Sequence, residues 1–304
     1  MSNRTQRSLI ITALATTAGL ATSLTGGPVW DEISDAGASA PKAEVTSGDN
    51  KPLTKIRGTL SATQFVGVDF EDMYLIRICD PDGFKATTLD EFGGAAEFDS
   101  QLFLFKPDPP SDAFGLLAND DVVPQAPDAL LTGMSTDGSG AEVPEPGLYF
   151  IAISPKGWAP GSDEGPIFFF EKPSEISGPD GQGGGLPQTF WRGDPAPIFG
   201  NGRYTVHLEA VTFGDVPIED CNCNGVLDAC DITLGTSGDD DNDGIPDECA
   251  CKSDLTGSGS VGFADLSMLL AQWGPCASCP ADLNCNNSVG FADLSMMLNA
   301  WGPC

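Results

Sequence analysis

The last 54 residues contain a tandem repeat with a period of 28 residues, which constrains the fold more than any other feature of the sequence. Residues 254–265 (DLTGSGSVGFAD) match residues 282–293 (DLNCNNSVGFAD), and the tetrapeptide WGPC ends each copy. Self-similarity at a fixed period indicates a duplicated structural unit. Neither copy is long enough to bury an apolar face alone, so we expect the two copies to pack against each other.

Each copy opens with a twelve-residue loop that carries side-chain oxygens at positions 1, 3, 5 and 12. Position 7 can add a backbone carbonyl. Hard oxygen donors in this order are the calcium-binding pattern of the EF-hand. We predict Ca²⁺ in both loops. Each loop has only two carboxylates, so both sites should be modest binders, the first more so. The predicted ligands are Asp254, Thr256, Ser258, the Ser260 carbonyl and Asp265 in the first loop, and Asp282, Asn284, Asn286, the Ser288 carbonyl and Asp293 in the second.

A short amphipathic helix is predicted after each loop. The apolar residues follow the spacing i, i+3, i+4 and i+7, which places them on one face of a helix. A Gly-Pro pair then ends each helix. Val261 and Val289, both at loop position 8, are expected at the seam between the copies. The predicted apolar stripes are Leu266, Leu269, Leu270 and Trp273 in the first copy, and Leu294, Met297, Leu298 and Trp301 in the second.

Loop, helix and duplication together resemble a type I dockerin, the module that attaches secreted proteins to cohesins, over residues 251–304. The resemblance implies that loop positions 10 and 11 recognise the partner. These positions are Phe263 and Ala264 in one copy and Phe291 and Ala292 in the other, so docking in two orientations is expected. In dockerins these positions usually carry hydroxyl or small aliphatic residues, so the partner class stays open between a cohesin-like protein and an envelope component.

A second tandem pair lies upstream, with its two members 19 residues apart. Residues 220–228 (DCNCNGVLD) and 239–247 (DDDNDGIPD) both carry the pattern D-x-[DN]-x-[DN]-G of calcium loops. They resemble thrombospondin type 3 repeats, in which calcium takes the place of a hydrophobic core. The predicted Ca²⁺ ligands are Asp220, Asn222, Asn224, the Val226 carbonyl, Asp228 and Asp231 in the first loop, and Asp239, Asp241, Asp243, the Ile245 carbonyl and Asp247 in the second.

The charge of the chain favours cations as partners. Forty-four acidic residues face fourteen basic ones, a formal net charge of −30, which argues against binding to nucleic acid and to anionic membranes. From Asp220 onward there are thirteen acidic residues and one basic residue, Lys252. Such a segment repels itself on compaction unless cations bind to it.

The N-terminus and the cysteines indicate export. Arg4 and Arg7 precede an uncharged apolar run, which predicts a secretory leader over residues 1–24; a retained membrane anchor is the alternative. Disulfides are then the default state of the ten cysteines, and a thiolate zinc site is the alternative. We expect three pairs, and no partner is assigned to Cys79, Cys221, Cys223 or Cys285. The expected pairs are Cys230–Cys249, Cys251–Cys276 and Cys279–Cys304.

Residues 56–214 have the pattern of a mainly β unit. Short apolar or alternating runs, separated by Gly, Pro and Asp, predict about eight strands in a jelly-roll-like antiparallel sandwich. Residues 172–202 are expected to be a loop. The triplet Asn119-Asp120-Asp121 is either a turn or part of a calcium site. His207 is expected on the solvent side of its strand. The clearest runs are residues 73–79, 102–105, 148–153, 167–170 and 204–211.

Six short motifs in this region, at residues 58–60, 72–74, 99–105, 115–121, 147–153 and 202–208, resemble the pre-peptidase C-terminal domain, a β-sandwich appended to secreted bacterial enzymes and surface proteins. The resemblance implies an accessory, non-catalytic unit. The sequence is consistent with this, because it contains no nucleophile elbow, metalloprotease helix or phosphate loop. The chain is thus divided into a leader (1–24), a polar segment (25–55), a sandwich (56–214), thrombospondin-like repeats (219–250) and a dockerin-like module (251–304).

The function predicted from the sequence is that of a secreted, calcium-binding, non-enzymatic protein for extracellular attachment or scaffolding. A carbohydrate-binding accessory protein of a polysaccharide-degrading system is the alternative. That alternative would be favoured if Trp158 and Trp191 are exposed on one face.

Overall fold

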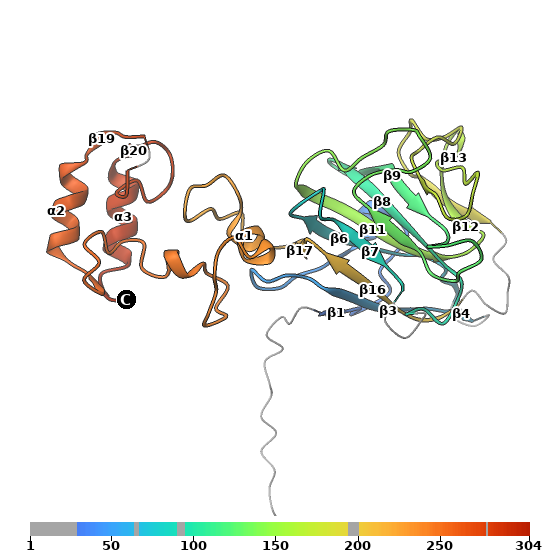
Figure 1. Ribbon diagram of the computed structural model, residues 1–304, viewed down its shortest axis with the longest axis horizontal. Coiled ribbons are helices and arrows are strands. Elements are labelled where there is room, and N and C mark those ends of the chain that lie inside the picture. The colour runs from blue at the N-terminus through green and yellow to red at the C-terminus, as the bar shows by residue number, and fades with distance from the viewer. Residues whose placement is uncertain (1–28, 64–66, 90–94, 194–200, 278) are drawn as a thin grey trace, which may run out of the picture.

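The computed structural model describes residues 29–63, 67–89, 95–193, 201–277 and 279–304, so the predicted leader lies outside the described residues. A mainly β unit forms one end of the molecule and a small helical unit forms the other (Figure 1). A segment with little regular structure joins the two. The mainly β fold class expected from the sequence is confirmed.

Two sheets form the larger unit. The strand order is β1-β3-β16-β7-β10 in the five-stranded sheet and β14-β9-β8-β11-β6-β17 in the seven-stranded sheet, where β2 also pairs with β6. All pairs are antiparallel except β1–β3 and β2–β6. The first sheet consists of β1 (Val29–Asp31), β3 (Lys55–Leu60), β7 (Lys85–Thr87), β10 (Leu130–Thr132) and β16 (Gly202–Glu209). The second consists of β2 (Glu44–Val45), β6 (Asp72–Ile78), β8 (Ser100–Asp108), β9 (Asp112–Asn119), β11 (Gly147–Pro155), β14 (Ile176–Ser177) and β17 (Val211–Phe213).

The two sheets enclose the main hydrophobic core. Successive side chains of a strand point to opposite faces, so Tyr149, Ile151 and Ile153 of β11 join this core while Phe150 and Ala152 point the other way. The inner residues of β16 (Tyr204, Val206 and Leu208) face them from the other sheet. His207 lies between Val206 and Leu208 and is partly exposed, as its alternation predicts.

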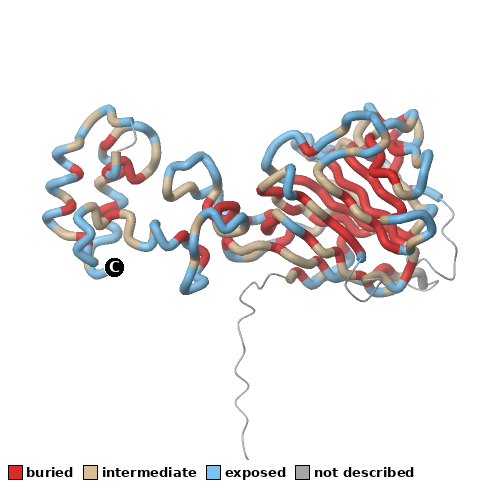
Figure 2. The backbone as a smooth tube through the Cα atoms, viewed as in Figure 1, coloured by how far each residue is buried: buried red, intermediate tan, exposed pale blue. Residues whose placement is uncertain are grey.

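The outer face of the seven-stranded sheet is covered as well (Figure 2). A small sheet of β12 (Trp158–Ser162), β13 (Gly165–Pro166) and β15 (Phe190–Gly193) lies over it, with β15 inside the segment that the sequence predicts as a loop. Burial on both faces explains the continuous apolar runs in β8 and β11. The strand predicted over residues 167–170 is wrong: Ile167 and Phe168 lie in irregular chain packed on this face, which accounts for their hydrophobicity.

The two tryptophans proposed for sugar stacking belong to this covering layer. The Trp191 ring packs edge-on against Phe103 and its Nε1 donates to the Ala38 carbonyl at 2.7 Å. Trp158 packs against Phe70 and donates to the Glu71 carboxylate. Because Trp191 is only 9% exposed and Trp158 is partly buried, these two side chains do not form an exposed aromatic platform.

The run of residues 204–211 was expected to be one strand, but it divides at Ala210. This residue has a φ of +58°, a left-handed conformation that breaks the strand. The chain therefore leaves β16 in one sheet and enters β17 in the other, which carries the following residues toward the smaller unit.

The last 85 residues form two parts. The spacer contains α1 (Asp228–Leu234) and the single 3-10 turn η2 (Asp247–Cys249). The C-terminal module contains α2 (Phe263–Ala271) and α3 (Phe291–Asn299). Its short strands cross between the copies: the loop strand of each copy pairs with the exit strand of the other. These strands are β18 (Ser260–Val261) with β21 (Gly302–Pro303), and β20 (Ser288–Val289) with β19 (Gly274–Pro275).

The packing of the two copies confirms part of the sequence prediction. Val261 and Val289 are 3% and 1% exposed and lie in a shared core with Leu269 and Met297. The predicted helix stripe is too wide, however. Leu270 and Leu298 are 51% and 52% exposed, and Trp273 and Trp301 are also exposed, because each helix is covered only on the side that faces the other copy.

All ten cysteines lie within the described residues and all form disulfides, but the three expected pairings are wrong. Crossed strands carry the C-terminus of the second copy to the start of the first, so Cys304 meets Cys251 rather than Cys279. Cys276 and Cys279 close the turn between the copies. Helix α1 packs against β17, which places Cys230 beside Cys79, so these two form a disulfide. Cys249 then pairs with Cys221. The pairs are Cys79–Cys230, Cys221–Cys249, Cys223–Cys285, Cys251–Cys304 and Cys276–Cys279.

Candidate metal-binding loops

The four loops predicted to hold calcium share one pattern of hydrogen bonds. In each loop, Oδ1 of the first Asp accepts from the backbone N–H at position 5, and Oδ2 accepts from the N–H at position 6. These eight distances lie between 2.6 and 3.1 Å. The loops therefore curl around the side chain at position 1. The four first residues are Asp220, Asp239, Asp254 and Asp282.

The curl depends on left-handed backbone at positions 4 and 6. Glycine occupies position 6 in three loops with φ between +80° and +86°, and Asn287 takes this place in the fourth at +63°. Glycine and asparagine tolerate this conformation best. Position 4 has φ between +60° and +68° in all four loops. Its residues are Cys223, Asn242, Gly257 and Cys285.

This equivalence accounts for Cys285, which has no counterpart in the other 28-residue copy. Cys223 and Cys285 occupy position 4 of the first spacer loop and of the last loop, and they are joined to each other. The disulfide therefore links the two loops through the same position in each. The sequence shows the shared position only when all four loops are aligned together.

The loop at residues 239–247 brings three of its predicted ligands together. Carboxylate oxygens of Asp239, Asp241 and Asp243 lie within 4.8 Å of one another. Asp247 lies apart from this group and accepts the N–H of Asp240 at 3.1 Å. A buried hydrogen bond of 2.9 Å, from Asn50 to the Gly244 carbonyl, fixes the loop to the sandwich.

The loop at residues 220–231 joins its predicted ligands by side-chain hydrogen bonds. Asn222 and Asn224 both donate to the Asp231 carboxylate, at 3.3 and 2.9 Å. Asp228 instead accepts the N–H of Cys221 at 2.8 Å. Asn222 also donates to Glu248, at 3.1 Å, so a carboxylate that follows the second loop belongs to the first. Glu248 was not singled out from the sequence because it lies outside both motifs.

The Asp at position 12 connects each C-terminal loop to its helix. One oxygen of Asp265 accepts from the Gly262 N–H at 2.8 Å, at the start of α2, and the other accepts from the Thr256 N–H at 2.9 Å. Asp293 does the same for α3, with bonds to Gly290 and Asn284 of 2.7 and 3.2 Å. A carboxylate at a helix N-terminus is favoured by the helix dipole. Both aspartates are buried. Their hydrogen bonds to the N–H at position 3 hold positions 3 and 12 close together.

The acidic groups of the first C-terminal loop are held in their ionised form. Desolvation raises the pKa of Asp254, but hydrogen bonds from the Ser258 and Gly259 N–H groups outweigh it and lower the pKa to about 2. Desolvation also opposes a lower pKa at Asp265, and the Gly262 N–H and the Thr256 groups again outweigh it. Both carboxylates are therefore negatively charged at neutral pH, as cation ligands must be.

Two carboxylates of the triplet at residues 119–121 bind a lysine, although Asp99, Asp120 and Asp121 also lie close enough together to hold a metal ion. Lys156 Nζ lies 2.8 Å from Asp120 and 3.0 Å from Asp121, with Asp99 at 3.7 Å. Desolvation lowers the pKa of Lys156, but its bonds to these carboxylates raise the pKa above its ordinary value, so the ammonium stays charged. Asn119 donates to the Glu175 carbonyl at 2.8 Å. The triplet is thus a salt-bridged turn.

The residues predicted to recognise a partner lie on the surface of the C-terminal module. Phe263 and Phe291 are 80% and 82% exposed, and Ala264 and Ala292 are exposed as well. Phe263 packs edge-on against Trp301, and Phe291 against Trp273, each pair with ring centroids 5.1 Å apart. Each aromatic pair therefore combines the loop of one copy with the helix end of the other.

Comparison with protein-family models, with curated proteins and with solved structures found no match. Within the described residues, no helix is long and apolar enough to cross a membrane.

Proposed function

We propose that this protein is an exported, calcium-binding, non-catalytic attachment or scaffolding protein whose C-terminal module docks a protein or envelope partner. The observation that carries the proposal is the shared geometry of the four loops. Each curls around the aspartate at position 1 and carries oxygen-bearing side chains at positions 1, 3 and 5, which lie together in the loop of Asp239, Asp241 and Asp243.

The donor set fits Ca²⁺ better than other metals. Oxygen ligands from carboxylates, amides, hydroxyls and carbonyls suit a hard cation, whereas zinc prefers Cys and His. Every cysteine is in a disulfide, so no thiolate is left for zinc. Bound calcium would offset the repulsion among the thirteen acidic residues of this segment, which has Lys252 as its only base. It would therefore stabilise the folded form of these loops.

The exposed aromatic pairs support docking by the C-terminal module. Exposed apolar patches of this kind mark interaction sites on proteins. Leu270 of α2 and Leu298 of α3 add further exposed apolar surface to the module. Because the copies are equivalent, either aromatic pair presents the same chemistry, and a dockerin-like module with this symmetry would accept one partner in two orientations.

The disulfides support a role outside the cell and give the chain a continuous framework. Cys79–Cys230 joins the sandwich to the spacer, and Cys223–Cys285 joins the spacer to the C-terminal module. Five disulfides are typical of an oxidising compartment. In this proposal the sandwich, with the jelly-roll-like architecture expected from its sequence, is an accessory unit held in a defined place relative to the docking module.

The docking proposal is tested with aromatic variants of the module. Purified chain would be immobilised and binding of an isolated envelope fraction measured with calcium and with chelator. We expect calcium-dependent binding that survives Phe263→Ala alone and Phe291→Ala alone, because either face suffices. The double variant should lose binding, while Leu89→Ala, an exposed apolar residue of the sandwich, should retain it. Equal binding by wild type and the double variant would contradict the proposal.

A further inference from the structure

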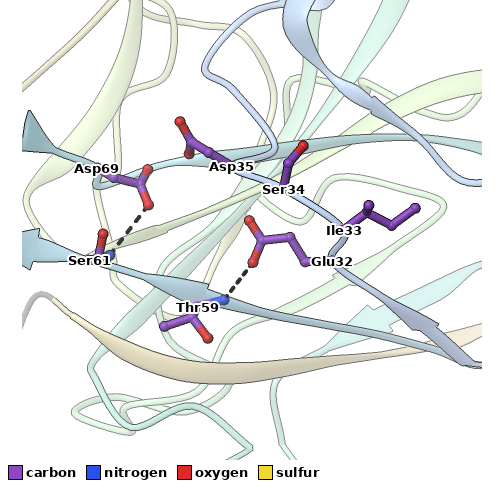
Figure 3. A pocket seen from close by; sticks show the side chains of 7 residues that line it. All are labelled: Glu32, Ile33, Ser34, Asp35, Thr59, Ser61 and Asp69. Atoms are coloured by element: carbon purple, nitrogen blue, oxygen red, sulfur yellow. Dashed lines mark hydrogen bonds between the residues drawn. The ribbon is translucent and has the colours of Figure 1, made fainter. Parts of the chain in front are cut away.

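An acidic pocket lies at one edge of the sandwich, far from the calcium loops in sequence. Glu32 and Asp35 follow β1, Thr59 and Ser61 belong to β3 and the residue after it, and Asp69 precedes β6. Figure 3 shows the side chains of Glu32, Asp35 and Asp69 around this pocket, whose volume is about 400 Å³. The pocket therefore combines three separate segments of the chain.

Hydrogen bonds hold two of these carboxylates in place. Glu32 Oε2 accepts the Thr59 N–H at 2.9 Å, and Asp69 Oδ2 accepts the Ser61 N–H at 3.4 Å (Figure 3). Carboxylate oxygens of Glu32, Asp35 and Asp72 lie within 4.8 Å of one another. Three acidic groups thus converge within the distance that one bound cation can bridge.

Asp72 points to a ligand independently of the cluster. This first residue of β6 is fully buried, with an exposed fraction of 0%. Its Oδ2 accepts the Tyr204 hydroxyl at 2.5 Å, whereas its Oδ1 is buried and has no hydrogen-bond partner among the described residues. A buried carboxylate oxygen without a hydrogen-bond partner destabilises the fold, and more so when the group is charged.

The charges of the pocket are not balanced by protein groups. Within the described part of the chain, none of Glu32, Asp35, Asp69 and Asp72 forms an ion pair. Desolvation, followed by the charge of Asp35, raises the pKa of Asp69 to about 7. Desolvation likewise raises the pKa of Asp72 to about 8, against the hydrogen bond from Tyr204. A bound cation would supply the counter-charge that no ion pair provides.

We propose that a divalent cation of the calcium class binds between this pocket and the buried Asp72, with Glu32, Asp35 and Asp72 as ligands and Asp69 alongside. The donors are all oxygens, which selects a hard cation. No His or Cys lines the pocket among the described residues, which disfavours zinc. This site is independent of the C-terminal loops and goes beyond the proposed docking function.

The position of the pocket defines what this cation does. Glu32 and Asp35 lie between β1, which pairs with β3 in one sheet, and β2, which pairs with β6 in the other. Asp72 is the first residue of β6. A cation bound by all three residues would fasten the N-terminal segment to β6. It would also supply the positive charge that the buried Asp72 lacks.

The test is calcium stoichiometry of the full chain, measured by equilibrium dialysis against calcium chloride. Glu32→Gln combined with Asp35→Asn removes two proposed ligands without touching the buried Asp72, and Asp35 is exposed, so folding should be retained. The matched control is Asp31→Asn, an exposed acidic residue of the same segment. We expect the double variant to bind one equivalent less than wild type and to lose part of the calcium-induced rise in thermal midpoint.

The control should match wild type in both measurements. An unchanged stoichiometry in the double variant would overturn the proposed site. Asp239→Asn combined with Asp243→Asn should remove a different equivalent. If the Glu32/Asp35 variant loses one equivalent of calcium and the Asp239/Asp243 variant does not, the spacer-loop site is refuted and the sandwich site stands. If only the Asp239/Asp243 variant loses an equivalent, the sandwich site alone is refuted.

Discussion

Two neighbouring leucines of α2 should differ sharply in their contribution to stability. Both belong to the apolar stripe predicted from the sequence, but Leu269 is 0% exposed in the shared core and Leu270 is 51% exposed. Truncation of a buried leucine to alanine costs about 2–5 kcal/mol through lost burial and the cavity left behind. A change at a half-exposed position should cost roughly 1 kcal/mol or less.

The size of the module makes this difference decisive. At roughly 0.05–0.15 kcal/mol per residue, a unit of 54 residues has a free energy of unfolding of about 3–8 kcal/mol. Leu269→Ala should therefore remove most of it, whereas Leu270→Ala should leave the module folded. The second copy offers the same comparison. Met297→Ala should lower the free energy of unfolding strongly and Leu298→Ala only slightly, because the two side chains are 0% and 52% exposed.

The assay is urea unfolding of the full chain in calcium, followed by far-ultraviolet circular dichroism, since the described α-helices all lie after residue 227. The helical transition of Leu269→Ala should move to much lower urea while that of Leu270→Ala stays near wild type. Equal shifts for the two variants would refute the argument, because they would mean that both faces of α2 are buried to the same degree.

Two further predictions concern the connections of the spacer. Cys223→Ala with Cys285→Ala opens a disulfide that closes 62 residues, which in the chain-entropy model lowers the free energy of unfolding by about 4 kcal/mol. Cys276→Ala with Cys279→Ala opens a disulfide whose cysteines are only 3 residues apart, so the free energy of unfolding should fall by only about 2 kcal/mol. Both pairs would be measured by urea unfolding. A larger decrease for Cys276/Cys279 than for Cys223/Cys285 would contradict the prediction. Asn50→Ala removes a buried hydrogen-bond donor to the second spacer loop and should lower the free energy of unfolding by about 1–3 kcal/mol. Calcium binding to that loop, measured by calorimetry, should also weaken. An unchanged affinity would show that the loop needs no support from the sandwich.

The sequence predicted the elements of this fold better than their connections. Alternation and apolar runs identified four of the five clearest strands, because inward-facing side chains in β6, β8, β11 and β16 follow the two-residue period of a strand. The apolar run at residues 167–170 follows no such pairing. Its hydrophobicity comes from covering the outer face of a sheet, which local pattern cannot distinguish from a strand.

The disulfide errors have a physical cause of the same kind. Spacing along the chain favours Cys251–Cys276, since both lie in one copy. The actual partner, Cys304, is brought near by strand β21, which crosses to the other copy and pairs with β18. Such an exchange depends on how the copies pack, and no single copy carries a signal for it.

The candidate sites also differ in whether their residues are close together in the sequence. The four loops with the calcium-binding pattern are recognisable from the sequence because their candidate donors lie within twelve consecutive residues. The acidic pocket is not, because Glu32, Asp35 and Asp72 come from segments that only the folded sheets bring together. Asp72 carries no sequence signal beyond its place at the start of a strand.

The measurement that tests the central claim most directly is a calorimetric calcium titration of the full chain. It would be compared with a variant in which the first aspartate of every loop is changed to asparagine (Asp220, Asp239, Asp254 and Asp282). We predict saturable binding at several sites in wild type, loss of helical circular dichroism on chelation, and loss of the loop sites in the variant. Equal calcium uptake by the two proteins, or helicity that is indifferent to chelation, would contradict the account of this segment as a calcium-folded docking module.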